Sequence, residues 1–165
     1  MRQLINLFSA IALSLAFAMP AAAQLPSIQI KDINGKTVDT ATLANDGKPF
    51  VISFFATWCK PCVRELRAIA ELYPDWQDET GLKIFIVSID EAQNVSKVKP
   101  LVDGEGWEYD VLLDTNSDFF HALGLPMVPH LLILDGNGNI VESHSGYTDG
   151  SETEIIKKVR SLIND

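Results

Sequence analysis

The sequence has few cysteines and few basic residues, and each shortage excludes a class of protein. Two cysteines in 165 residues cannot build a disulfide-stapled mini-protein, nor can they alone fill a four-ligand zinc site. The chain has 13 Lys and Arg against 22 Asp and Glu, which gives a formal charge of −9. Its surface therefore repels nucleic-acid phosphates and anionic lipid headgroups. With 47% hydrophobic residues, the chain suits one globular domain without a nucleic-acid partner.

The first 23 residues have the pattern of a secretory signal peptide. Arg2 is followed by an apolar run over residues 4–19 and then by small residues up to Ala23. We expect cleavage after Ala23, which leaves a domain of residues 24–165 in the periplasm or another extracytoplasmic space. The alternative is a retained membrane anchor, for which the run is short, since a span needs about 20 apolar residues.

Apolar runs predict the strands. Residues 50–56, 83–89 and 131–134 are nearly continuous apolar stretches, typical of strands buried on both faces. A turn at 135–139 predicts a return strand from Ile140, and Asn34-Gly35 predicts a small N-terminal hairpin.

Helical periodicity separates these strands. Apolar residues recur every three or four positions over residues 59–73, and Pro74 is expected to end that helix. A helix around residues 95–102 precedes a strand at 109–113, and a last helix begins after Ser151. The order predicts an α/β fold, a mixed sheet with helices on both faces.

Two thiols three residues apart stand where a buried strand passes into a helix. Cys59 lies at the helix N-terminus, where free N–H groups and the helix dipole lower a thiol pKa below its usual value of about 8.5. We therefore predict that Cys59 is the exposed attacking thiolate and Cys62 the shielded resolving thiol. Pro61 lacks an N–H and removes nothing from a first helical turn.

Two other interpretations of the cysteine pair exist. A structural disulfide here closes only a four-residue loop and so gains little stability. A metal site needs further ligands, and His121, His130 and His144 are scattered along the chain.

Residues 54–62 (FFATWCKPC) resemble the active-site segment of the thioredoxin superfamily. The signal peptide, Glu65, the unit over residues 90–114 and Val128-Pro129 are similar to the TlpA/ResA-like branch of extracytoplasmic thiol–disulfide oxidoreductases. The resemblance implies a thioredoxin fold with an N-terminal hairpin and a central helix–strand insertion. The resemblance also favours a reductant of protein disulfides, such as those of apocytochrome c, that is recharged by a membrane electron donor. The dithiol itself carries two electrons, so we expect no cofactor, and we expect a monomer.

The resemblance also implies roles for single residues. Pro129 matches the family's cis-proline, which with Val128 orients a substrate main chain, although the residues alone indicate an ordinary loop proline. Glu65 matches a glutamate that exchanges a proton with the second cysteine. Its apolar helix neighbours agree with a carboxyl that is hard to ionise, but a solvated glutamate on the helix flank is the alternative. Trp58 is expected to line the substrate groove.

The chain departs from the family pattern at two positions. Ser53 stands where cytoplasmic thioredoxins carry a buried aspartate, so the buried acid must be Glu65. His130 follows the proline where threonine is common. A protonated His130 within reach of Cys59 would stabilise the thiolate; the alternative is a histidine at the strand edge that points to solvent.

Other functions remain open from the sequence. The couple could act as a disulfide oxidant or isomerase, because Lys60 and Pro61 set no clear potential. A thiol peroxidase typically has threonine three residues before its attacking cysteine. Ala56 occupies that position here, which disfavours a peroxidase. A Cu(I)-binding module would use Cys59 and Cys62, with His130 as a third ligand.

Overall fold

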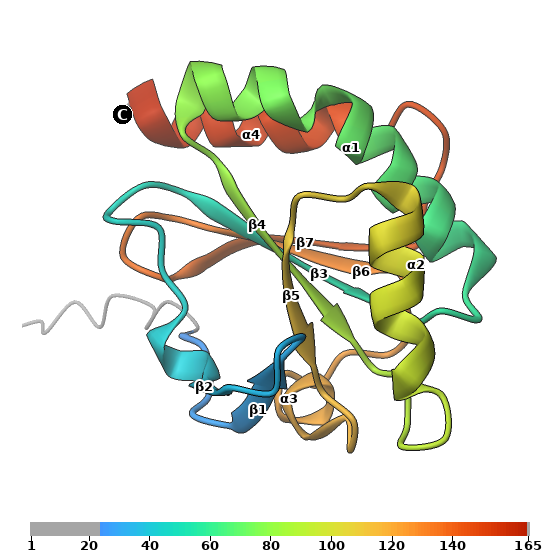
Figure 1. The fold of residues 1–165 in the computed structure, drawn as a ribbon. Helices are drawn as coiled ribbons and strands as arrows, with labels where there is room; N and C mark the ends of the chain where they lie inside the picture. The colour runs from blue at the N-terminus through green and yellow to red at the C-terminus, as the bar shows by residue number, and fades with distance from the viewer. Residues whose placement is uncertain (1–23, 165) are drawn as a thin grey trace, which may run out of the picture.

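The structure, a computed structural model, describes residues 24–164 and contains one seven-stranded mixed sheet with helices on both faces (Figure 1). The strands are β1 (Gln29–Asp32), β2 (Thr37–Asp39), β3 (Phe50–Phe55), β4 (Lys83–Ser88), β5 (Asp110–Leu113), β6 (His130–Leu134) and β7 (Ile140–Ser145). The helices are α1 (Lys60–Thr80), α2 (Val98–Glu105), α3 (Asp118–Ala122) and α4 (Glu152–Asn164). Short 3₁₀ turns lie at Thr40–Thr42 and Val95–Lys97. The signal peptide predicted over residues 1–23 falls outside the described residues.

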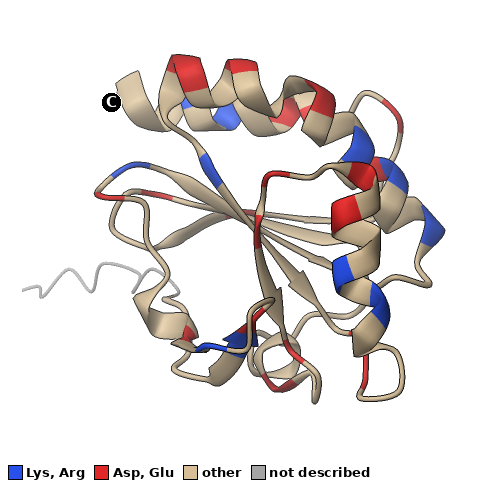
Figure 2. Ribbon diagram, viewed as in Figure 1, with Lys and Arg blue, Asp and Glu red and all other residues tan. Residues whose placement is uncertain are grey.

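The centre of the sheet is built from the apolar runs, as predicted. The strand order is β2-β1-β5-β4-β3-β6-β7, and β3, β4 and β5 pair in parallel. All six residues of β3 are buried, and neither β3 nor β6 carries a Lys, Arg, Asp or Glu (Figure 2). Because β3 and β4 are parallel, their carboxyl ends lie at the same sheet edge. The segments that follow these two strands therefore meet there.

The N-terminal hairpin predicted at Asn34-Gly35 is confirmed. β1 and β2 are antiparallel, and β1 also pairs with β5. In the turn, Asp32 Oδ1 accepts the N–H groups of Asn34 and Lys36, both at 2.9 Å. Gly35 has a φ of 86°, a left-handed conformation that favours glycine.

Helix α1 does not end at Pro74, so that prediction is wrong. The helix continues to Thr80, with Pro74 inside it. An interior proline costs about 3 kcal/mol, but the apolar stripe continues beyond it with Trp76, which is only 5% exposed. Burying a large apolar side chain stabilises by about 1.5–3 kcal/mol, so Trp76 offsets much of the cost of the proline.

Each face of the sheet has its own hydrophobic core. The first lies under α1, α2 and α4 and includes Cys59, Cys62 and Leu66. The second lies under α3 and the N-terminal segment and includes Phe54 and Phe119. In Figure 1, α1 and α4 cover one face while α3 lies on the opposite side. Helix α3 was not predicted, because five residues are too few to show a helical period.

Within residues 24–164, no helix combines the length and the apolar character needed to span a membrane.

Candidate functional site

The two cysteines form a disulfide at the start of α1. The Sγ atoms of Cys59 and Cys62 are bonded, with the Cα atoms 5.3 Å apart. Cys59 is the N-cap residue, and its Sγ accepts a hydrogen bond of 3.3 Å from the N–H of Cys62. The helix begins at Lys60, so Pro61 lies in the first turn, as predicted. The helix N-terminus therefore directs an N–H group at the sulfur expected to become a thiolate.

Cys59 is buried, so the prediction of an exposed sulfur is wrong in this oxidised state. Its residue exposure is 5%, against 0% for Cys62. The order of accessibility agrees with the predicted order of roles, but the margin is narrow. Cys59 packs into the core beneath α1, because the disulfide holds its side chain against the helix.

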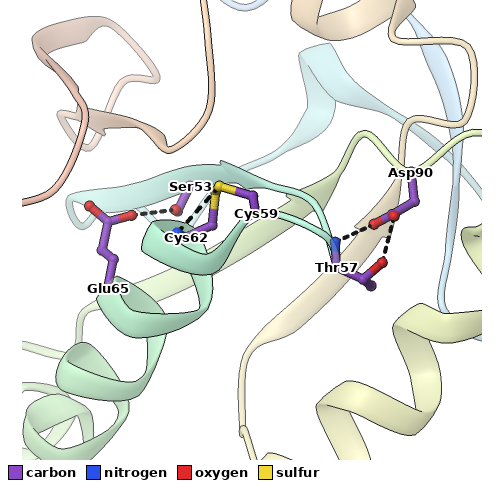
Figure 3. The surroundings of a disulfide bond; sticks show 6 residues. All are labelled: Ser53, Thr57, Cys59, Cys62, Glu65 and Asp90. Carbon is purple, nitrogen blue, oxygen red and sulfur yellow. Dashed lines mark hydrogen bonds between the residues drawn. A yellow bond between two sulfur atoms is a disulfide. The ribbon is translucent and has the colours of Figure 1, made fainter.

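Glu65 lies one turn after Cys62 and is buried, so the solvated alternative is wrong. Its exposed fraction is 5%, and its Oε2 accepts a hydrogen bond of 3.4 Å from the hydroxyl of Ser53 on β3 (Figure 3). Burial raises the pKa of Glu65 to about 7; the Ser53 hydrogen bond acts in the opposite direction, and the charge of Glu152 adds to the rise. A carboxyl with this pKa can both take and give a proton near neutrality.

Glu65 also lines a cavity of about 500 Å³. Its walls include Glu65 and the hydroxyl-bearing side chains of Tyr147, Thr148 and Ser151. Arg64 holds this wall against α1, because its guanidinium lies 5.5 Å from the centre of the Tyr147 ring and 3.3 Å from Asp149 Oδ1. The buried carboxyl thus borders a polar space rather than a closed apolar core.

The peptide bond between Val128 and Pro129 is cis, as the family resemblance implied and the residues alone did not. Pro129 is buried, and its carbonyl accepts the N–H of Gly146 at 2.9 Å. Among the backbone hydrogen bonds of residues 24–164, none outside helices and strands uses the N–H or C=O of Val128. Met127 before it is 56% exposed. This loop offers a free main-chain edge beside apolar surface.

Trp58 is 61% exposed directly before Cys59, where a wall of a substrate groove was expected.

His130 is buried on the face of the sheet opposite the thiols, so both expectations for this residue are wrong. In β6 it is opposite Phe54 of β3, which belongs to the core under α3, whereas Cys62 belongs to the core under α1. Its ring is 4% exposed and its nitrogens contact the hydroxyls of Ser143 and Ser145 at 2.8 and 2.9 Å. Burial lowers the pKa of His130, so the predicted imidazolium is disfavoured.

Metal ligands do not converge in the part of the chain that the structure describes. No group of three or more His, Cys, Asp or Glu side chains within residues 24–164 could hold an ion. Both ring nitrogens of His130, the suggested third copper ligand, are engaged by serine hydroxyls.

Asp90 is the site residue that sequence reasoning missed. It follows β4 and accepts hydrogen bonds from both the N–H and the hydroxyl of Thr57, two residues before Cys59 (Figure 3). A carboxyl just after a buried strand was the available signal, but its partner lies 33 residues away in the sequence.

Comparison with known proteins gives consistent matches. Residues 21–143 match the AhpC/TSA family. The thiol–disulfide oxidoreductase ResA of Bacillus thuringiensis is 29% identical over 137 residues, covering 82% of this chain and 76% of that protein. A thioredoxin-like protein from Porphyromonas gingivalis, known from its solution structure, is 61% identical, with a TM-score of 0.77 over 87% of this chain and 94% of that one. The crystal structure of a protein described as thiol:disulfide interchange protein DsbE, from Chlorobium tepidum, shares the fold at 15% identity, with a TM-score of 0.73 over 86% of this chain and 96% of that one.

Proposed function

The chain belongs to the AhpC/TSA family and has a thioredoxin-like fold, and from this premise we propose that it is a thiol–disulfide oxidoreductase acting on protein disulfides. The observation that carries the proposal is the Cys59–Cys62 disulfide at the N-terminus of α1, one turn from a buried carboxyl. The relatives named ResA support it.

The reaction transfers two electrons from the dithiol to a partner disulfide. The Cys59 thiolate attacks one partner sulfur, which forms a mixed disulfide and releases the first partner thiolate. Cys62 then gives its proton to the Glu65 carboxylate and attacks Cys59 Sγ. The second partner thiolate leaves, the Cys59–Cys62 bond closes, and the two partner sulfurs take up two protons. In this scheme, Trp58 contacts the partner and the main chain of Val128, before Pro129, pairs with it.

The groups around the dithiol support transfer of electrons from this protein to its partner. Couples become oxidising when the reduced form is stabilised, as by a cation near the thiolate. Here the buried titratable group one turn from Cys62 is a carboxyl, and His130, whose pKa is lowered by burial, lies on the opposite face of the sheet. Neither group stabilises a thiolate, which favours a reductant for partners such as the disulfide of apocytochrome c.

The midpoint of the Cys59–Cys62 couple against a glutathione buffer tests the direction. A value near −250 mV or lower supports a reductant, whereas one near −120 mV indicates an oxidant. Turnover of hydrogen peroxide, or copper retained after purification under reducing conditions, would favour the peroxidase or the Cu(I)-binding module instead.

Export belongs to the same proposal. The N-terminal pattern supports a signal peptide cleaved after Ala23, and an exported reductant needs electrons from a membrane donor. Mass spectrometry of the protein from the native cell should find Gln24 as the first residue; an intact Met1 in a cytoplasmic fraction would contradict export.

A further inference from the structure

The carboxylate of Asp90 is buried beside the loop that carries Cys59, and the exchange reaction gives it no part. Asp90 is 0% exposed. Its Oδ2 accepts the N–H of Thr57 and the hydroxyl of Ser88, both at 2.8 Å, and its Oδ1 accepts the hydroxyl of Thr57 at 2.7 Å. Hydrogen bonds to a charged, buried acceptor are strong, and each loses its partner if the carboxylate is removed.

Thr57 belongs to the turn that aims the nucleophile. The N–H of Cys59 donates to the carbonyl of Ala56 at 3.0 Å, which closes a turn with Thr57 and Trp58 as its middle residues. Asp90 holds the first of these, and the second is 61% exposed. Fixing Thr57 thereby sets the direction of both the groove residue Trp58 and the sulfur of Cys59.

Asp90 is held in place by the end of the paired strands β3 and β4 and by Ser88. The N–H of Ile89 donates to the carbonyl of Phe55 at 2.9 Å, which extends the pairing of β3 and β4 up to the residue before Asp90. Ser88 Oγ accepts the N–H of Asp90 at 3.0 Å while donating to its carboxylate, so the side chain has one orientation.

We propose that Asp90 is a positioning residue for thiol–disulfide exchange: it holds the turn over residues 56–59 so that Cys59 stays at the N-terminus of α1 when the disulfide is open. In the oxidised protein the covalent bond to Cys62 also holds Cys59, but reduction removes that tie. The inference rests on the proposed function, because the turn matters only if Cys59 is the attacking sulfur.

The chain offers a matched control at Asp114. It follows β5, is 1% exposed, and accepts the N–H groups of Phe119 and Phe120 at 3.2 and 2.9 Å. Those residues lie in α3, in the core on the opposite face from Cys59. Removing Asp114 deletes similar buried hydrogen bonds without touching the turn.

The experiment compares Asp90→Ala, Asp90→Asn and Asp114→Ala with the wild-type protein. The readouts are the denaturant midpoint, kcat/KM for reduction of a protein disulfide, and the pH dependence of Cys59 alkylation in the reduced Cys62→Ser background. Asp90→Ala should lower kcat/KM about tenfold or more and move the alkylation curve to higher pH. Asp90→Asn should recover most of both, because an amide can accept from the N–H of Thr57 and donate to its hydroxyl. Asp114→Ala should lose stability alone.

A purely structural Asp90 would behave like Asp114, with reduced stability and unchanged alkylation and kcat/KM, and that result overturns the proposal. If Asp90→Ala does not fold, Thr57→Val takes its place, because it deletes only the 2.7 Å hydroxyl contact. It should move both kinetic readouts in the same direction by a smaller factor, and no movement overturns the proposal. A wild-type protein that reduces no protein disulfide overturns the proposed function instead.

Discussion

Ser53 donates a hydrogen bond of 3.4 Å to Glu65 across the contact between β3 and α1. By resemblance to cytoplasmic thioredoxins, Ser53 stands at the position of their buried aspartate, and its hydroxyl points at the Glu65 carboxyl. One buried acid is thus supplied from the helix rather than from the strand, and the strand contributes a neutral donor that favours its ionised form.

Removing this donor should make Glu65 a weaker acid. Ser53→Ala takes away the hydrogen bond that lowers the pKa of Glu65, so the pKa should rise above its value of about 7. An NMR titration of the Glu65 carboxyl carbon measures the change directly. Ser96→Ala, at an exposed position, is the control. A lower or unchanged pKa in Ser53→Ala would show that the hydroxyl does not stabilise the carboxylate.

The raised pKa of Glu65 predicts a pH-dependent stability. Folding raises the pKa from 4.5 to about 7, so its favourable contribution is complete below 4.5 and is lost as pH rises through 7. The loss for a shift of this size is of order 3 kcal/mol. Oxidised wild type should lose this much relative to Glu65→Gln between pH 4.5 and 8, as measured by urea unfolding. Parallel stability curves for the two proteins would contradict the prediction.

Glu65→Gln should also slow exchange. A glutamine cannot take the proton of Cys62, so the step that resolves the mixed disulfide should slow near neutral pH. Glu71→Gln on the exposed side of the same helix is a matched control and should leave the rate unchanged. Stopped-flow measurements give the rate of protein disulfide reduction between pH 6 and 9 for each protein. Equal rates in wild type and Glu65→Gln over this range would show that the glutamate has no part in proton transfer.

The order of the two thiols can be tested by trapping. Cys62→Ser cannot resolve a mixed disulfide, so partner proteins should accumulate on Cys59 and appear on non-reducing gels. Cys59→Ser should trap far less, because Cys62 is completely buried. The reverse pattern would exchange the roles of the two cysteines.

His130 should influence stability rather than redox potential. His130→Ala removes a buried ring with two hydrogen bonds, at a cost of about 1–3 kcal/mol. Because burial lowers the pKa of His130 and its ring lies on the face opposite the thiols, the midpoint potential should change with pH in the same way in both proteins from pH 5.5 to 7.5. A histidine-dependent inflection in the wild-type curve alone would falsify this assignment.

Much of the architecture and the location of the chemistry could be predicted from local patterns. Continuous apolar runs identified the buried strands, Asn34-Gly35 the hairpin, and the spacing of Cys59 and Cys62 at a strand-to-helix junction the redox pair. These features depend on neighbouring residues and on backbone periodicity, which a sequence displays directly.

Tertiary packing decided the rest. Pro74 was expected to end the helix, but the helix continues past it, and the burial of Trp76 offsets much of the cost of the proline. The sequence did not indicate which face of the sheet His130 lies on, because the four other residues of its strand are all apolar and show no alternation of polar and apolar side chains.

The sequence by itself determined which atoms react, because a sulfur at a helix N-terminus is specified by adjacent residues. Only the tertiary structure decided how those atoms are controlled. The pKa of Glu65 depends on its burial, on the hydroxyl of Ser53 in β3 and on the charge of Glu152 in α4, and the hydrogen bonds from Thr57 to Asp90 span 33 residues. Desolvation and long-range hydrogen bonds arise only when distant segments pack together, and no local pattern encodes them.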